Sequence, residues 1–192
     1  KPSAPADAGT PAKRLIALPG ALQFGSPSFS PDMKWVAYTR RGIESGGVNI
    51  YIAPADGSGT AVNVTKLNAF HGRPTWSPDG RFLFFSSNRD GSGLYVLPLQ
   101  PEDAREDELE IKFEKPKAPV AITIDFEDTP QRIRKISGQN PDADLTVTDE
   151  GQIFFVSGGD AYRLSFDGKE STKLTNGGGV SNLRVSADGK TL

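Results

Sequence analysis

Short runs of apolar and aromatic residues, separated by glycine-rich and polar turns, dominate the pattern of the chain. Residues 82–85 read Phe-Leu-Phe-Phe and residues 153–156 read Ile-Phe-Phe-Val, so apolar side chains occupy consecutive positions in both runs. Runs of this length are too short for a helix and are typical of strands. Neighbouring side chains of a strand point to opposite faces, so these runs predict strands that are buried on both faces. A sandwich strand with one solvated face would alternate instead.

The apolar runs belong to a repeated unit. A Phe-Ser-Pro-Asp sequence begins at Phe29 and a Trp-Ser-Pro-Asp-Gly sequence begins at Trp76, an offset of 47 residues. Weaker copies have their glycines at Gly151 and Gly189, so the period is about 40 to 47 residues with one insertion. The Ser-Pro-Asp-Gly sequence predicts a tight hairpin, because proline presets φ, aspartate bonds back to the turn backbone and glycine takes a positive φ.

Each unit contains four predicted strands. In the first unit the hairpin is followed by a strand that begins near Trp35, by a third strand at residues 49–53, and by a fourth strand after an Asp-Gly turn at Asp56. Four short antiparallel strands per period predict a blade of a β-propeller. The predicted fold class is therefore all-β: a β-propeller of four-stranded antiparallel blades, present as an incomplete ring, because three blades cannot close a ring that needs at least about four.

The phase of the repeat divides the chain into blades and parts of blades. Residues 1–18 are interpreted as the end of a preceding blade, with a disordered linker as the alternative. The blades are predicted at residues 19–66, at residues 67–136 and at residues 137–176. Residues 177–192 are predicted to start a further, truncated blade.

One insertion, at about residues 100–118, breaks the repeat. Residues 101–117 are dense in charge and poor in core-forming side chains, which predicts a solvated loop or a short amphipathic helix. A docking segment for a partner is the alternative. Residues 119–136 then read as an extended strand, an acidic turn and another strand.

Composition excludes several classes of protein. The 22 basic and 24 acidic side chains give a formal net charge of -2, so no nucleic-acid partner is expected. The chain has no cysteine and one histidine, which excludes disulfides, thiolate nucleophiles and metal sites made of several histidines. No apolar run approaches the roughly 18 residues of a membrane span.

The chain offers little catalytic chemistry. His71 is the one histidine, and no Gly-x-Ser-x-Gly nucleophile elbow is present, so His71 is interpreted as a polar residue at the start of a blade. The sequences that follow Asp56 and Asn88 lack the ligand spacing of a calcium loop, and Gly177 to Gly179 do not open a helix. We therefore predict no catalytic residue, no metal site and no cofactor.

Four arginines are the candidate substrate-binding residues: Arg40, Arg41, Arg73 and Arg89. They are predicted at strand ends and connecting loops, where a propeller presents side chains to its channel or upper face. An arginine side chain can grip a peptide carboxylate through two parallel hydrogen bonds. A role in surface solubility remains the alternative for all four.

The repeats, with their Asn-Ile-Tyr and Leu-Tyr-Val strands, resemble the TolB-type, WD-like propeller repeat. A more specific resemblance begins at the Ile-Asp-Phe-Glu sequence of residues 124–127. This sequence follows the charged insertion and is followed by Arg-Ile-Arg at residues 132–134 and by the Gly-rich turn at residues 177–179. This order resembles the N-terminal propeller region of bacterial tricorn protease-like serine peptidases, and the two resemblances together cover nearly the whole chain.

The resemblance implies a non-catalytic propeller segment that gates or docks peptide substrates for a catalytic domain outside this chain. Its implied partners are a peptide or protein substrate and other domains of the same parent chain, and a homo-oligomer of the parent is compatible with it. The implied location is periplasmic or secreted, with the cytoplasm as the alternative. The alternatives are a TolB-like periplasmic protein-binding propeller, and the propeller cap of a prolyl oligopeptidase-like or amidohydrolase enzyme.

Overall fold

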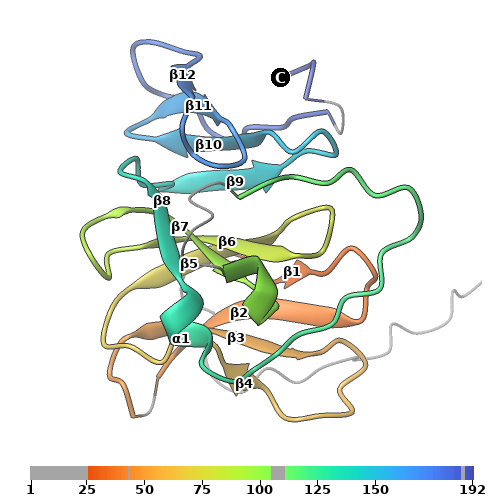
Figure 1. Cartoon of the computed structure of the whole chain (residues 1–192). Coiled ribbons are helices and arrows are strands. Elements are labelled where there is room, and N and C mark those ends of the chain that lie inside the picture. Colours follow the sequence, from red (N-terminus) through yellow and green to blue (C-terminus); the bar gives the residue numbers. More distant parts are fainter. Residues whose placement is uncertain (1–25, 43, 105–110, 187–188) are drawn as a thin grey trace, which may run out of the picture.

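The computed structural model describes residues 26–192 except residue 43, residues 105–110 and residues 187–188. The predicted unit at residues 1–18, and the start of the blade predicted from residue 19, lie outside the described residues. The described part contains three four-stranded sheets, stacked one above another in Figure 1. All strand pairs within the sheets are antiparallel.

The strands follow the chain in order within each sheet. The first blade contains β1 (Ser28–Phe29), β2 (Trp35–Arg41), β3 (Val48–Pro54) and β4 (Val62–Asn63). The second blade contains β5 (His71–Trp76), β6 (Phe82–Ser87), β7 (Gly93–Pro98) and β8 (Arg134–Ser137). The third blade contains β9 (Ala143–Val147), β10 (Ile153–Ser157), β11 (Asp160–Leu164) and β12 (Ser171–Lys173). No ring closes among the described residues, so the predicted fold class, an incomplete all-β propeller, is confirmed.

Two core layers lie between neighbouring blades, and a smaller cluster around Val36 and Tyr38 lies on the other face of the first blade. On β6, Leu83 and Phe85 pack against the first blade with residues such as Ile50 and Ile52 of β3. The intervening residues Phe82 and Phe84 pack against the third blade. All six residues of β6 are buried, which explains why its sequence does not alternate between apolar and polar positions.

The Ser-x-Asp hairpins share one hydrogen-bond pattern. In the first hairpin, the Ser30 hydroxyl donates to Asp32 Oδ1 at 2.7 Å, and the amide of Trp35 donates to Ser30 Oγ at 2.9 Å. The same bonds recur in the hairpin of residues 77–81 and in that of residues 165–169. The serine and aspartate therefore close the turn from within, as the repeat predicts.

The connection between β7 and β8 carries the charged insertion at about residues 100–118. Its described residues contain a 3-10 turn, η1 (Pro101–Ala104), and one turn of helix, α1 (Thr129–Arg132), which packs on β7. The strand predicted at the start of residues 119–136 is wrong, because the amide of Ile122 donates to the Asp32 carboxylate and not to a neighbouring strand. Residues 111–126 nevertheless lie against the blades, with Ile111 and Ile122 buried. We call residues 111–126 the strap.

The described residues after β12 form a turn and no strand. After β12 the described residues are irregular, and the amide of Gly189 donates to the Ser186 carbonyl at 2.8 Å, as in the earlier hairpins. That residues 177–192 start a further blade remains a prediction.

Candidate functional site

The four predicted arginines belong to one end of the blades, which we call the turn end. It is formed by the β2–β3 and β6–β7 turns and by residues 66–70, which lead from the first blade to the second. The amide of Val48 donates to the Ala69 carbonyl at 2.9 Å, and the amide of Asn88 donates to the Phe70 carbonyl at 3.2 Å. These bonds hold the turns of two neighbouring blades beside the connecting segment.

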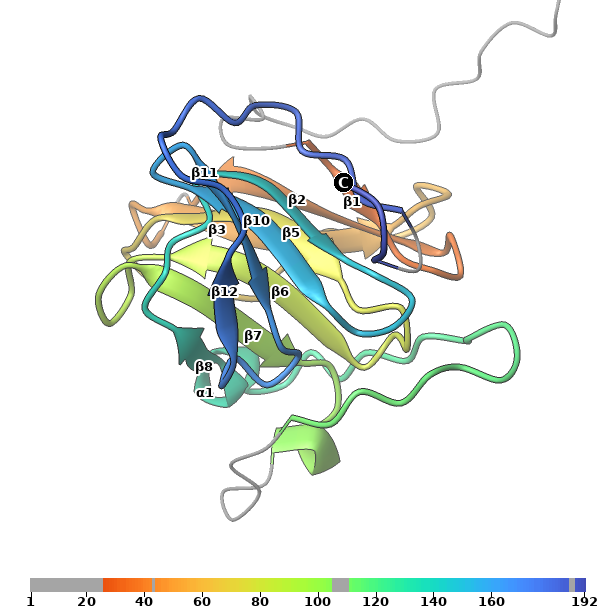
Figure 2. The same cartoon turned by 90° about the horizontal axis from the view of Figure 1, so that it is seen from above.

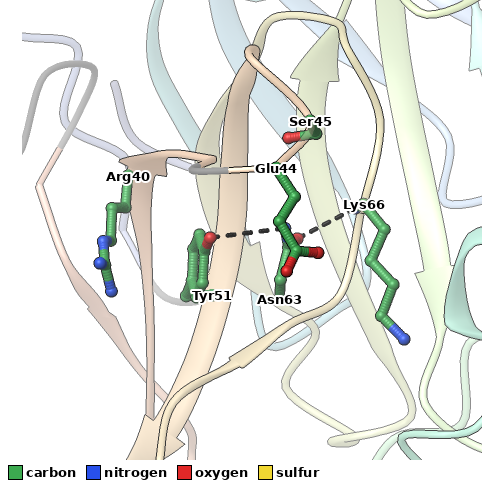
Figure 3. A pocket seen from close by; sticks show the side chains of 6 residues that line it. All are labelled: Arg40, Glu44, Ser45, Tyr51, Asn63 and Lys66. Carbon is green, nitrogen blue, oxygen red and sulfur yellow. Dashed lines mark hydrogen bonds between the residues drawn. The ribbon is translucent and has the colours of Figure 1, made fainter.

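Of the four arginines, Arg40 lines a pocket (Figure 3). The pocket has a volume of about 520 Å³ and is lined by Arg40, Glu44, Ser45, Tyr51, Asn63 and Lys66. It lies on the face of the first blade that points away from the second, because Tyr51 alternates with Ile50 and Ile52, which face the second blade. The pocket therefore uses a sheet face that no described blade covers.

Tyr51 forms the floor of the pocket. Its ring stacks on the buried ring of Tyr38, with ring centroids 5.9 Å apart, and the Arg40 guanidinium lies over it at 5.3 Å from the centroid. The side-chain amide of Asn63, opposite Tyr51 on β4, lies 3.5 Å from the Tyr51 hydroxyl. In Figure 3 Arg40 lies on one side of the Tyr51 ring, and Glu44 and Lys66 lie on the other.

Asn63 also shapes the backbone that carries Lys66. Its Oδ1 accepts hydrogen bonds from the amides of Thr65, at 3.1 Å, and of Lys66, at 3.0 Å. Lys66 has a φ of 47°, in the left-handed region, and this local turn directs the chain away from β4. The lysine side chain is thereby presented at the rim of the pocket.

The two cations of the pocket, the Arg40 guanidinium and the Lys66 ammonium, form no ion pair with a described carboxylate, although Glu44 lines the same pocket. Burial raises the pKa of the Tyr38 hydroxyl, and the positive charge of Arg40 opposes this rise. The site therefore offers two cations, an aromatic face and one carboxylate, that of Glu44, to a ligand.

The other three arginines do not join this pocket. Arg41 is exposed at the end of β2, and Arg73 has a φ of 54° within an irregularity of the β5–β6 pairing. The side chain of Arg89 is fixed by two contacts within the fold. Its Nη1 donates to the Pro130 carbonyl of α1 at 2.7 Å, and its Nε lies 3.3 Å from the Asp90 carboxylate. The structure thus brings Arg40 alone of the four to the pocket.

His71 is completely buried, at 0% exposure, against the edge of Phe85. Burial, with the nearby charge of Arg89 as a smaller cause, lowers the pKa of His71 to about 4. Among the described residues neither ring nitrogen has a hydrogen-bond partner, so no described serine is activated by His71. The described residues also contain no group of three or more His, Asp or Glu side chains that could hold a metal ion.

Sequence reasoning missed Tyr51, Asn63 and Lys66. The alternation of Tyr51 with two isoleucines signals that its ring lies on the opposite sheet face from theirs. The Asn-x-x-Lys spacing is a further signal, since asparagine closes turns through its side chain. That Glu44 of the β2–β3 turn lies beside Lys66, 22 positions further along the chain, depends on the strand register and cannot be read from either local sequence.

The fold is that of a β-propeller segment, and solved propellers match it along most of its length. TolB from Acinetobacter baumannii is 24% identical, with a TM-score of 0.58, over 86% of this chain and 35% of that protein. A putative TolB from Agrobacterium tumefaciens is 21% identical, with a TM-score of 0.59, over 88% of this chain and 53% of that protein. The tricorn protease is 19% identical, with a TM-score of 0.60, over 85% of this chain and 19% of that protein.

These likenesses show a fold shared with the TolB and tricorn protease propellers. The chain spans between 19% and 53% of the length of these three proteins. No model of a known protein family matches the chain. Within the part of the chain that the structure describes, no helix is long and apolar enough to cross a membrane.

Proposed function

We propose that the chain is a peptide-docking propeller segment of a tricorn-like serine peptidase, whose catalytic domain lies outside this chain. The pocket around Tyr51 carries the proposal, because it combines an aromatic ring with two cations that form no ion pair among the described residues. The likeness to the tricorn protease propeller supports the nature of the parent protein. A periplasmic or secreted location belongs to the same proposal.

The pocket suits a peptide that carries an acidic group beside an apolar or aromatic one. The guanidinium of Arg40 and the ammonium of Lys66 attract a carboxylate, and arginine binds it through two parallel hydrogen bonds. The Tyr51 ring is half-buried, and its exposed part offers apolar contact next to these charges. Because the pocket is open to solvent, each charged contact contributes modestly, and docking rather than tight capture is expected.

Binding of fluorescein-labelled octapeptides tests the docking role. Fluorescence anisotropy compares a peptide that ends in glutamate with an amidated peptide that ends in glutamine. We expect Arg40→Gln and Lys66→Gln each to weaken binding of the acidic peptide about 3- to 10-fold, and to leave the neutral peptide unaffected.

Arg41→Gln is the matched control, because Arg41 follows Arg40 directly but is exposed outside the pocket. We expect it to change binding of the acidic peptide less than twofold. An acidic peptide that does not bind, or that loses the same affinity in the Arg41→Gln and Arg40→Gln variants, would exclude a docking role for the pocket. Hydrolysis of either peptide by the purified chain would contradict the placement of catalysis outside it.

A TolB-like protein-binding propeller is the second candidate. The two TolB structures match the chain as well as the tricorn protease does, with TM-scores of 0.58, 0.59 and 0.60. This candidate predicts that a folded protein partner binds and that short peptides do not compete with it. Competition by the acidic octapeptide decides between the two functions.

A further inference from the structure

The strap crosses the opposite end of the blades, which we call the hairpin end because it carries the Ser-x-Asp hairpins. In Figure 1 the strap is the green segment that runs along the stack from near β9 towards α1. Figure 2 shows the same segment outside the sheets, beyond the ends of their strands. The strap begins with Ile111 in the core layer between the second and third blades and reaches the first blade at Ile122.

Two hairpin aspartates bind the backbone of the strap. In the first blade, Asp32 Oδ2 accepts a hydrogen bond from the amide of Ile122 at 3.0 Å, and in the second, Asp79 Oδ2 accepts one from the amide of Glu114 at 3.4 Å. In both aspartates the other oxygen, Oδ1, closes the hairpin. Burial would raise the pKa of Asp32, but the bonds from Ile122, Ser30 and Lys34 outweigh it and hold that pKa below its ordinary value.

Glycine at the hairpin makes room for the strap. A Cβ atom on Gly80 would lie 2.7 Å from the side chains of Val120 and of Ile122, closer than such atoms approach. A Cβ atom on Gly151, in the third blade, would overlap the ring of Phe113. Both glycines have positive φ, so the residue that the turn requires is also the one that lets a neighbouring chain approach.

The contacts of the strap follow the alternation of an extended chain. Val120, Ile122, Ile124 and Phe126 pack towards the first core layer, while Ala121 and Thr123 are exposed. The indole of Trp35 donates to the Ile122 carbonyl at 3.4 Å, and its ring meets Phe126 edge-on at 5.8 Å. The blades therefore hold the strap through backbone hydrogen bonds and alternate apolar side chains, as proteins do when they bind extended peptides.

Between the two anchoring aspartates the strap arches away from the hairpins. A pocket of about 630 Å³ lies beneath the arch, lined by Asp79, Arg81, Val120 and residues 114–118. Ion pairs hold the start of the arch, with Arg81 paired to Asp103 at 2.5 Å and to Glu114 at 3.3 Å. Lys117, Ala118 and Pro119 are exposed, so the middle of the strap has few contacts to lose on release.

We propose that the hairpin end is a two-point binding site for an extended polypeptide, with Asp32 and Asp79 as its backbone acceptors. The strap is its resident occupant, and a second extended peptide with the same alternation takes its place when the strap is released. This site is independent of the Tyr51 pocket, which lies towards the other end of the first blade.

The hairpin of residues 165–169 provides a matched control. Asp167 Oδ1 accepts bonds from the Ser165 hydroxyl at 2.6 Å and from the amide of Lys169 at 3.2 Å, as in the other two hairpins. Its Oδ2, however, accepts no backbone amide from any residue that the structure describes. Asp167→Asn therefore measures how a change inside a hairpin affects peptide binding. Asp32→Asn makes the same change in a hairpin and also removes the oxygen that accepts a hydrogen bond from the strap.

A synthetic peptide with the sequence of residues 111–126, labelled with fluorescein, tests the proposal by fluorescence anisotropy. Ile122→Pro in the full chain removes the amide that Asp32 binds and leaves the site intact. We expect the peptide to bind this variant at least about tenfold more tightly than it binds the unaltered chain, where the tethered strap competes at high effective concentration. Circular dichroism verifies that the variant is folded.

Adding Asp32→Asn to the Ile122→Pro variant is expected to weaken peptide binding about tenfold. The side-chain NH2 group of the asparagine would face the backbone N–H of the peptide, and two donors form no hydrogen bond. Adding Asp167→Asn instead is expected to leave it unchanged. If Ile122→Pro does not fold, the full chain with the recognition sequence of a site-specific protease inserted after Lys117 replaces it, and mass spectrometry verifies the cut. Binding that is no tighter after release, or that falls equally in the two aspartate variants, would overturn the proposal.

Discussion

The turn end and the hairpin end of the blades differ in how far their polar groups are satisfied. At the hairpin end, both oxygens of Asp32 and of Asp79 accept hydrogen bonds, and Arg81 has two carboxylate partners. At the turn end, Arg40 and Lys66 have no ion pair among the described residues. The comparison teaches that the two ends of one repeat can differ in their polar contacts: the hairpin end binds a segment of its own chain, whereas the turn end presents two cations without an ion pair among the described residues.

The largest loss of stability is expected when a methyl group is added at Gly80, at the hairpin end. Gly80→Ala combines a φ of 69° with overlap against Val120 and Ile122, so we expect it to lower the free energy of unfolding by about 2 to 5 kcal/mol. Gly158→Ala, in the β10–β11 turn, has a φ of 58° and open space around the new atom, so about 1 kcal/mol is expected. Urea denaturation measures both, and equal losses would mean that the strap is not held closely.

The turn end is expected to weaken in acid. The folded-state pKa of His71, about 4, lies below its ordinary value of 6.5, so the unfolded chain takes up the proton first. Protonation of His71 therefore does not affect the free energy of unfolding above pH 6.5, and it lowers that free energy by up to about 3 kcal/mol as the pH falls to 4. His71→Phe, which keeps a ring against Phe85, should remove this dependence. An unchanged pH profile of thermal unfolding in that variant would contradict the assignment.

Arg89 is expected to influence the loss of stability that protonation of His71 causes in acid. Its charge lowers the pKa of His71, so Arg89→Gln should shift the acid transition to higher pH and make the loss of stability between pH 6.5 and 4 smaller. The variant also loses the bond to the Pro130 carbonyl, which costs about 1 to 3 kcal/mol at all pH values. Unfolding followed at pH 7 and at pH 4 separates the two effects. A shift of the transition to lower pH would reverse the assigned role.

The smallest effect is expected at an exposed ion pair of the strap. Lys115 Nζ lies 2.5 Å from the Glu150 carboxylate, and this partner raises the pKa of Lys115. Both side chains are largely exposed, so solvent screens the pair, and Glu150→Gln should change stability little. Urea denaturation at low and at high salt measures the effect. A large loss of stability in this variant would mean that this ion pair, and not only the two aspartates, holds the strap on the blades.

Local patterns were sufficient to predict the blades. The unbroken run at residues 82–85 predicts burial on both faces, and in the structure these residues divide between the two core layers. The hairpin sequence predicts a turn closed by serine and aspartate, and the bonds of Ser30 and Asp32 show it. These features depend on residues close together in the chain, so a short window contains the information.

The strap and the pocket could not be predicted in the same way. The sequence of residues 119–126 favours a strand, but the path of the strap is determined by its contacts with Asp32, Asp79 and Gly80, which precede it by tens of residues. The residue type and the position at strand ends make four arginines candidates, but the stacking of Arg40 on Tyr51, which places one of them in the pocket, depends on the fold. Both misses concern contacts between distant segments.

The strap also changes the range over which the blades influence one another. In a linear array of repeats, each unit contacts only its neighbours, and such arrays can unfold one unit at a time. A single covalent segment that packs with the third blade at Phe113 and bonds the first at Asp32 joins units that are not adjacent. Loss of one terminal blade then costs contacts at the other, so the three blades are expected to unfold as one cooperative unit.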